Sequence, residues 1–246
     1  MINVILDIIL NISIKIKKLE NVYGLLNDDE SRMVFASRIK SIIEGDNGYI
    51  RRSKFAHYFH PEVMIQKGDT ILDGGVSGDI DTINNFVRHI GDKGHIYAFE
   101  PEPVCYSQAK DKVKNINNVQ LIPYGLYDKL DIAIFKVQGG ASYVTDVETD
   151  KTITCHMTTV DTVATEYDIK KVDITKLDIE DSEMKALKGG VKTIKKYRPK
   201  LLISVYHKWL RSKLQILYGA SFTHTMGNSF ICHAELRYKY VYENTN

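Results

Sequence analysis

The sequence predicts an α/β fold in which helices cover both faces of a mostly parallel sheet, preceded by a helical appendage. From Lys67 onward, short apolar runs alternate with stretches of helical periodicity, the pattern of a parallel sheet with helical crossovers. A glycine-rich turn directly follows the first of these apolar runs. Upstream, residues 1 to about 60 carry helical rather than strand patterning. We therefore divide the chain into an appendage, residues 1–64, and a sheet domain, residues 65–246.

The appendage begins with a stretch that fits an amphipathic helix. Its apolar residues fall close to helical spacing: Ile2, Ile5, Leu6, Ile9, Ile12 and Ile16. Lysines follow this stretch rather than precede it, and no small-residue cleavage site is visible, so a secretory signal is not expected. We expect the helix to pack on the domain or on a second subunit, as in a homodimer. Peripheral attachment to a membrane surface is the alternative.

A second helix is expected between Asp28 and a strong stop at 45–48. Acidic residues at its start suit the helix dipole. An aromatic, basic segment then runs from Tyr49 to His60. Its His57 and His60 are three positions apart but have no further ligands nearby in the sequence, so a metal site is not predicted.

The sheet domain is predicted as strands and helices in alternation. Strands are expected at 70–72, 95–99, 119–122, 172–177 and 200–206, and helices at 80–90, 101–115 and about 184–194. Within 131–158, Ile132 and Ile134 indicate a strand, whereas glycines and a run of threonine and aspartate predict a long polar loop. The last forty residues predict a helix near 208–217 and strands around Phe222 and 237–242.

The composition excludes several classes of protein. Thirty-three basic residues against 31 acidic ones give a net charge of +2. A nucleic-acid scaffold carries a much larger positive net charge, so no nucleic-acid partner is expected. Hydrophobic residues at 43% and charged residues at 26% are ordinary globular values. Three scattered cysteines form neither a disulfide framework nor a metal-binding spacing. A reducing compartment is favoured, so we expect a cytoplasmic protein, membrane-associated only if the first helix attaches.

The turn after the first strand, residues 73–78, is the first motif with chemical content. Glycines let a backbone turn sharply and approach a ligand, and ligands of such sheets bind beyond the carboxyl ends of the strands. No register supplies the glycines of a dinucleotide fingerprint, and Asp79 and Asp81 would repel a pyrophosphate. A cationic cofactor without phosphate, such as S-adenosylmethionine, suits this loop, and Glu100 ends the second strand where an acid accepts ribose hydroxyls. The alternatives are a plain tight turn and an unliganded surface acid.

The second motif lies at 175–183. Alternation along a strand places Lys176 and Asp178 on one face, with Glu180 beyond them. A lysine inside a buried strand is costly unless it is paired or lines a cavity. Either Lys176 and Asp178 form a structural salt bridge, or this strand end faces the reaction centre.

Together these motifs resemble those of the FkbM family of S-adenosylmethionine-dependent methyltransferases. The similar stretches occur in the same order along roughly residues 65 to 210: 73–79, 98–101, 159–161, 175–190 and 205–208. The resemblance implies a class I, Rossmann-like fold with a mostly parallel seven-stranded sheet. It also implies methyl transfer to a hydroxyl, on a sugar, a glycan or a natural product. Where the family usually has glycine, this chain has Asp181, which would make the acceptor side more acidic.

The resemblance places the cofactor on Asp73, Gly75, Ser77 and Glu100, and it places Asp178 near the transferred methyl group. The other site residues are predicted from their positions in the sequence. In all, the residues predicted to bind the cofactor are Asp73, Gly74, Gly75, Ser77, Gly78, Glu100, Pro101, Tyr124 and Gly125. Asp178, supported by Lys176, is predicted to orient the acceptor hydroxyl, and His207 to take its proton. Glu180 and Ser142 are predicted to contact the acceptor, a small molecule or glycan. The competing hypotheses are a Rossmann enzyme that binds NAD or a nucleotide sugar, and a non-catalytic cofactor-binding module.

Overall fold

The computed structural model of the chain describes residues 16–17, 19–24, 26, 28–78, 80–204, 221–224 and 230–234, without the side chains of 62, 221–224 and 230–234. Several sequence predictions lie outside these residues: most of the first amphipathic helix, Asp79, the motif at 205–208 with His207, the helix at 208–217 and the strand at 237–242.

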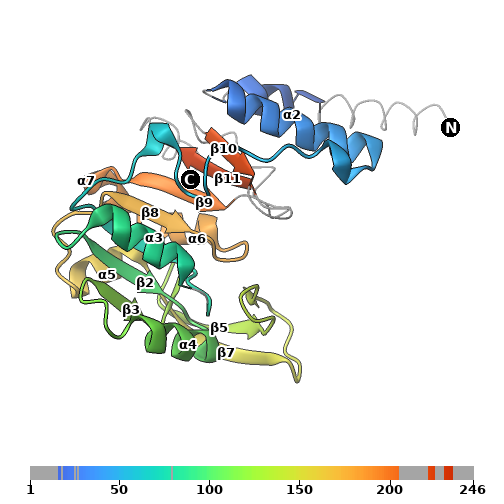
Figure 1. The fold of residues 1–246 in the computed structure, drawn as a ribbon. Helices are drawn as coiled ribbons and strands as arrows, with labels where there is room; N and C mark the ends of the chain where they lie inside the picture. The colour runs from blue at the N-terminus through green and yellow to red at the C-terminus, as the bar shows by residue number, and fades with distance from the viewer. Residues whose placement is uncertain are drawn as a thin grey trace.

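The main sheet has seven strands in the order β10-β11-β9-β8-β1-β2-β3 (Figure 1). Five neighbours run parallel: β9 (Lys200–Ser204), β8 (Ile174–Leu177), β1 (Thr70–Gly74), β2 (His95–Phe99) and β3 (Val119–Ile122). β11 (Phe230–Ala234) is antiparallel to β9 and to β10 (Ser221–His224), so β10 points the same way as the five. The predicted mostly parallel sheet is confirmed, although the sequence did not predict β11.

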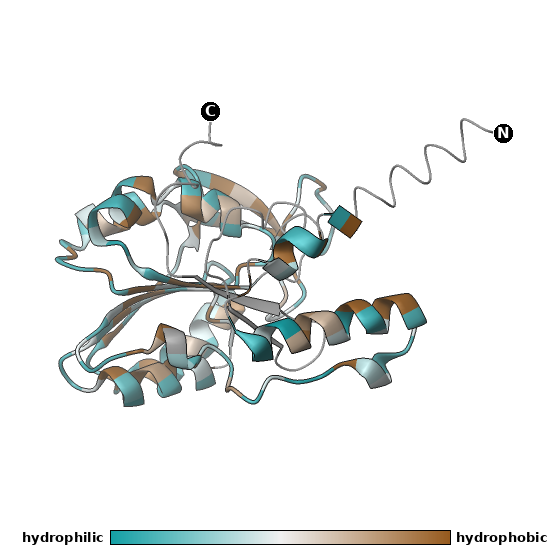
Figure 2. Cartoon of the chain, turned by 90° about the horizontal axis from the view of Figure 1, so that it is seen from above, coloured by the Kyte–Doolittle hydropathy of each residue, from teal (hydrophilic) through white to brown (hydrophobic). Residues whose placement is uncertain are grey.

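Helices cover both faces of the sheet, as Figure 2 shows. On one face, Ile71 of β1 shares a core with α3 (Asp81–Ile90) and α4 (Pro103–Val113). The next residue, Leu72, points to the opposite face. There it shares a core with α5 (Val160–Glu166), α6 (Glu183–Lys188) and α7 (Val191–Tyr197).

The single helical stripe predicted over 184–194 is two helices. At Gly189, between α6 and α7, a Cβ would lie 2.0 Å from the main-chain oxygen of Tyr127. Only glycine permits this close approach of two backbones. Gly189 and the following Gly190 separate the two helices, and glycine is a poor helix former.

A second sheet replaces the predicted polar loop. Its order is β4-β7-β5-β6, from β4 (Gly125–Leu126), β7 (Thr152–Thr158), β5 (Asp131–Lys136) and β6 (Tyr143–Val144). The strand at β5 is as expected, but the loop prediction is wrong for β7. There, Cys155 and Met157 are buried while Thr154 and His156 are exposed, the alternation of a half-buried strand. Threonine is a good strand former on such a surface, so the threonine run indicates a strand rather than a loop.

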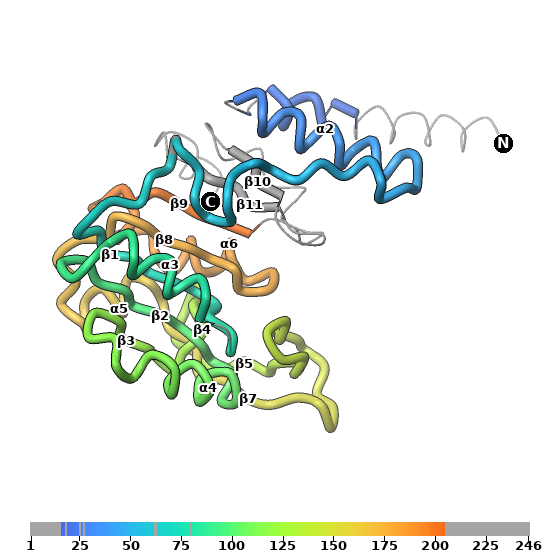
Figure 3. The backbone as a smooth tube through the Cα atoms, viewed as in Figure 1, coloured from blue at the N-terminus to red at the C-terminus, as the bar shows by residue number. Residues whose placement is uncertain are grey.

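The appendage contains the predicted second helix as α2 (Asp29–Glu44). Asp28 caps its start through the backbone N–H of Ser31, and Gly45 ends it in the left-handed conformation, with φ +67°. The chain then passes the β9 side of the sheet and enters β1 (Figure 3). On this path Tyr58 and Val63 are buried in the core shared with α3 and α4.

The outer part of α2 leaves apolar side chains in solvent, among them Ile42 and Ile43. Contact of the appendage with a second subunit or a membrane surface stays a prediction. Within the described ranges, no helix combines the length and the apolar character needed to cross a bilayer.

Candidate active site

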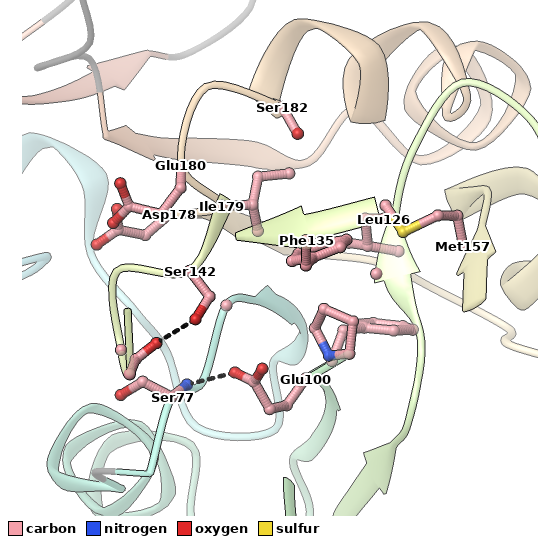
Figure 4. Close-up of a pocket in the computed structure, with 16 residues that line it drawn as sticks. Ser77, Glu100, Leu126, Phe135, Ser142, Met157, Asp178, Ile179, Glu180 and Ser182 are labelled. Atoms are coloured by element: carbon pink, nitrogen blue, oxygen red, sulfur yellow. Dashed lines mark hydrogen bonds between the residues drawn. The ribbon is translucent and has the colours of Figure 1, made fainter. Parts of the chain in front are cut away.

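A cleft opens at the carboxyl edge of β1, β2 and β8, where the second sheet meets the first (Figure 4). One wall is apolar, built from Phe99, Leu126, Phe135, Met157 and Ile179. Of the predicted site residues, eight line this cleft: Gly75, Ser77, Glu100, Pro101, Gly125, Ser142, Asp178 and Glu180. Residues predicted from three separate motifs thus lie around one cavity.

Gly75 makes the turn after β1 possible. Its φ is +82°, and a Cβ there would lie 1.9 Å from the main-chain oxygen of Asp178. Its N–H donates to the oxygen of Phe99, 3.0 Å away. Three strand ends therefore meet at Gly75 with no room for a side chain. The next turn residue in the cleft, Ser77, also has a positive φ, +55°, a strain that is common where a backbone is shaped around a ligand.

Glu100 follows β2 and is only 6% exposed. Oε2 accepts from the N–H of Ser77 at 2.7 Å, and Oε1 accepts from the N–H of Glu102 at 2.9 Å. Burial raises the pKa of Glu100, while these two N–H groups oppose the rise. The carboxylate is therefore held in one orientation at the cleft wall, and each oxygen has a second lone pair with which to accept a ligand hydroxyl.

The charge of the cleft restricts the ligand it suits. Among the described residues that line it, Glu100, Asp178 and Glu180 carry carboxyl groups, and none is lysine or arginine. A pyrophosphate would meet carboxylates without a compensating cation. A cationic cofactor with a flat aromatic base fits this lining, so the residues present are compatible with S-adenosylmethionine.

Asp73 and Lys176 are not in the cleft lining. They are opposite each other in the register of β1 and β8, and Nζ of Lys176 lies 3.0 Å from Oδ1 of Asp73. Lys176 also donates to the carbonyls of Gly74 and Gly75, at 3.0 and 2.7 Å. The ion pair considered between Lys176 and Asp178 lies instead between Lys176 and Asp73. Both side chains are buried below the cleft, where they support the glycine turn.

Asp178 has a partner that the sequence did not predict. The hydroxyl of Tyr58 donates to its Oδ2 at 2.9 Å. The ring of His57 stacks on that of Tyr58, with centroids 3.9 Å apart and an interplanar angle of 15°. Burial lowers the pKa of His57 to about 4, although the nearby charge of Asp178 opposes this and that of Lys176 adds to it. In the sequence, the one feature that could have indicated this contact is the aromatic segment immediately before the sheet domain.

Other predicted cofactor residues lie elsewhere. A Cβ on Gly74 would contact the side chains of Leu126 and Leu177, both at 3.1 Å, so this glycine serves core packing. A Cβ on Gly78 would lie 2.2 Å from Oε1 of Gln108 on α4. Tyr124 faces a different surface hollow, beside His156. Of the residues described, no three metal-binding side chains gather into a candidate metal site.

Comparisons with known proteins agree with this fold. The model of the methyltransferase FkbM domain matches residues 66–238. The FkbM methyltransferase of Methylobacillus flagellatus has a similar structure, with 17% identity and a TM-score of 0.70 over 91% of this chain. The match covers 60% of that protein, so this chain spans less than two thirds of its length. No curated protein matches the chain significantly.

Two further structures resemble the chain more distantly. Fibrillarin of Aeropyrum pernix, with natively bound S-adenosylmethionine, has 14% identity and a TM-score of 0.44 over 69% of this chain and 67% of its own. An S-adenosylmethionine-dependent O-methyltransferase of Thermotoga maritima has 12% identity and a TM-score of 0.44 over 82% and 72%. The family match extends over most of the chain and includes all the strands of both sheets. The chain belongs to the FkbM methyltransferase family and has the class I methyltransferase fold.

Proposed function

We propose that the protein transfers a methyl group from S-adenosylmethionine to a hydroxyl of a sugar, a glycan or a natural product. The observation that carries this proposal is the lining of the cleft, which presents carboxylates, an apolar wall and no described cation at the ends of β1, β2 and β8. The membership of the FkbM family supports the same reaction.

The cofactor side of the cleft follows from Glu100 and its neighbours. Two backbone N–H groups orient Glu100, and its carboxylate accepts hydrogen bonds from the ribose hydroxyls. The apolar wall packs against the adenine. S-adenosylmethionine, when bound, supplies an electrophilic methyl group on a sulfonium. Carboxylates near a sulfonium lower the cost of burying its charge.

The acceptor side is the end of β8. Asp178 and Glu180 line the cleft there and accept hydrogen bonds from the acceptor, which holds one hydroxyl in line with the methyl group. Such alignment is the main source of acceleration in a displacement of this kind. In the transfer a new O–C bond forms, the C–S electron pair returns to sulfur and the hydroxyl proton passes to a base. We propose His207 for that base.

The proposal is tested with two assays on the full chain. Calorimetric titration with S-adenosylmethionine and with NAD compares the two cofactor classes. Transfer of labelled methyl from S-adenosylmethionine to a glycan extract of the source cell then tests the reaction. Binding of S-adenosylmethionine without NAD binding, together with labelled glycan, is the expected result. Binding of NAD alone would replace the proposal with a dehydrogenase-type function, and binding without transfer to any extract fraction would favour a non-catalytic module.

A further inference from the structure

Tyr58 precedes the sheet domain in the sequence but lies at the acceptor side of the cleft. Its side chain is 2% exposed. Its hydroxyl donates to Oδ2 of Asp178 at 2.9 Å and lies 3.5 Å from Oγ of Ser204 on β9. The two hydrogen-bonded residues are 120 positions apart in the chain. This contact joins the connecting segment, the residues between α2 and β1, to Asp178, the residue proposed to orient the acceptor.

The surroundings of Tyr58 hold its ring firmly in place. His57 stacks on one side of it, and Phe86 of α3 lies at a centroid distance of 6.2 Å. Nζ of Lys176 lies 5.6 Å from the ring centroid, within the range of a cation–π contact. The backbone of Tyr58 has φ +65°, a conformation that is unfavourable for a bulky residue. Such strain persists only where the surrounding structure imposes it.

We propose that Tyr58 is a positioning residue for methyl transfer. Its hydroxyl orients the Asp178 carboxylate toward the acceptor, and the connecting segment is thereby part of the active site. This inference rests on the proposed function. Asp178 follows β8 directly, at the start of a turn in which two residues have positive φ, Glu180 at +52° and Asp181 at +76°. The N–H of Asp178 donates to the carbonyl of Gly74 at 3.1 Å, which fixes the backbone, and the Tyr58 hydroxyl acts on the carboxylate itself. A misplacement of such a group by about 1 Å costs about 100-fold in rate.

The test compares two tyrosine-to-phenylalanine variants. Tyr58→Phe removes the hydroxyl that contacts Asp178 and keeps the ring stack. Tyr197→Phe is the matched control, because its hydroxyl donates at 2.7 Å to the carbonyl of Ile169 and lies outside the cleft. With labelled S-adenosylmethionine and the glycan extract, we expect Tyr58→Phe to lower kcat at least 10-fold. Its affinity for S-adenosylmethionine, measured by calorimetry, should stay within 2-fold, and Tyr197→Phe should leave both quantities within 2-fold.

A double-variant cycle separates positioning from a general structural effect. If Tyr58 acts through Asp178, Tyr58→Phe should slow the reaction no further in an Asp178→Asn background. Losses that multiply, or a full rate in Tyr58→Phe, would overturn the inference. Equal losses of cofactor affinity and kcat would overturn it too, because the change would then be structural.

A spectroscopic measurement tests the contact without any acceptor. In protein labelled with 3-fluorotyrosine, the ¹⁹F resonance that is missing from Tyr58→Phe belongs to Tyr58. It should shift in Asp178→Asn. If Tyr58→Phe fails to fold, the wild-type and Asp178→Asn spectra are compared without assignment, and the absence of any shifted tyrosine resonance between them would overturn the inference. A wild-type protein that neither binds S-adenosylmethionine nor transfers methyl would instead refute the proposed function, while the resonance still reports on the contact.

Discussion

Asp73 and Lys176 form an ion pair across β1 and β8 in which both side chains are buried, at 1% and 4% side-chain exposure. Nζ of Lys176 reaches beyond this pair to the carbonyls of Gly74 and Gly75. The ammonium of Lys176 on β8 therefore contacts both β1 and the glycine turn that follows it. Burial raises the pKa of Asp73, and the charge of Lys176 opposes the rise. The pair supports the cleft from below without contacting its interior.

Lys176→Met should destabilise the fold strongly, because it leaves the Asp73 carboxyl buried without a counter-charge. We expect a loss of about 3–5 kcal/mol in the free energy of unfolding, measured with urea. The control is Lys171→Met, since Lys171 pairs with Asp173 at 2.9 Å on the exposed surface, where such pairs contribute about 0–1 kcal/mol. Equal losses in the two variants would show that burial of the first pair is unimportant.

Gly75→Ala should prevent the cleft from forming. The new methyl group would lie 1.9 Å from the Asp178 oxygen, at a φ of +82°, so both the backbone and the β8 end would have to move. Gly139→Ala is the control, because Gly139 has φ +61° with no atom within 4 Å of the Cβ position. Urea unfolding should show a loss of about 1–2 kcal/mol for Gly139→Ala, the cost of the left-handed conformation alone, and a several-fold larger one for Gly75→Ala. Similar losses of unfolding free energy in the two variants would mean that the clash of the new methyl group with the Asp178 oxygen does not destabilise the fold.

Glu100→Ala should weaken S-adenosylmethionine binding by about 1.5–3 kcal/mol, the range for hydrogen bonds to charged groups. Glu102→Ala is the neighbouring control. Glu102 caps α4 by accepting from the N–H groups of Val104 and Cys105, so its loss should lower stability by about 1 kcal/mol with little change in affinity. Calorimetric titration and thermal unfolding measure the two effects. An unchanged affinity in Glu100→Ala would remove Glu100 from the cofactor site.

Local pattern was sufficient to predict the strands of the parallel sheet and the position of Glu100. The strands β1, β8 and β9 are short and almost fully buried, and β2 and β3 are short and rich in apolar residues. Periodicity and turn residues therefore identify them. The second sheet was missed because the Thr152–Thr158 strand looks like a polar loop until its alternate burial is known. Short segments of this kind take their conformation from the neighbours they pair with, here β5.

Side-chain partners across the fold were harder to predict than the strands. Lys176 pairs with Asp73 because the register of β1 and β8 places them opposite each other, and a sequence does not reveal a register between strands about 100 residues apart. The Tyr58–Asp178 bond depends on where the connection from α2 crosses the sheet edge. Motif spacing therefore located the residues of the cleft but not the contacts that hold them.

Glu183 predicts a pH dependence of stability. It is fully buried at the start of α6, where Oε1 accepts from the N–H of Ile179 at 3.0 Å and Oε2 has no hydrogen-bond partner among the described residues. Burial raises its pKa to about 8, the N–H of Ile179 opposes the rise, and the charges of Asp178 and Asp181 add to it. In the unfolded chain a glutamate has a pKa of about 4.3. Between these two values the folded protein therefore holds one more proton than the unfolded chain.

The free energy of unfolding should consequently fall as the pH rises from about 4.3 to about 8, by a few kcal/mol, and level off above that. Glu183→Gln resembles the protonated acid in shape and keeps an acceptor for Ile179, so it should remove this slope and be more stable than the wild type at pH 9. Glu166→Gln, an exposed change of equal charge on α5, should keep the slope. Urea unfolding at a series of pH values measures all three proteins, and parallel curves for Glu183→Gln and the wild type would place the titration on another group.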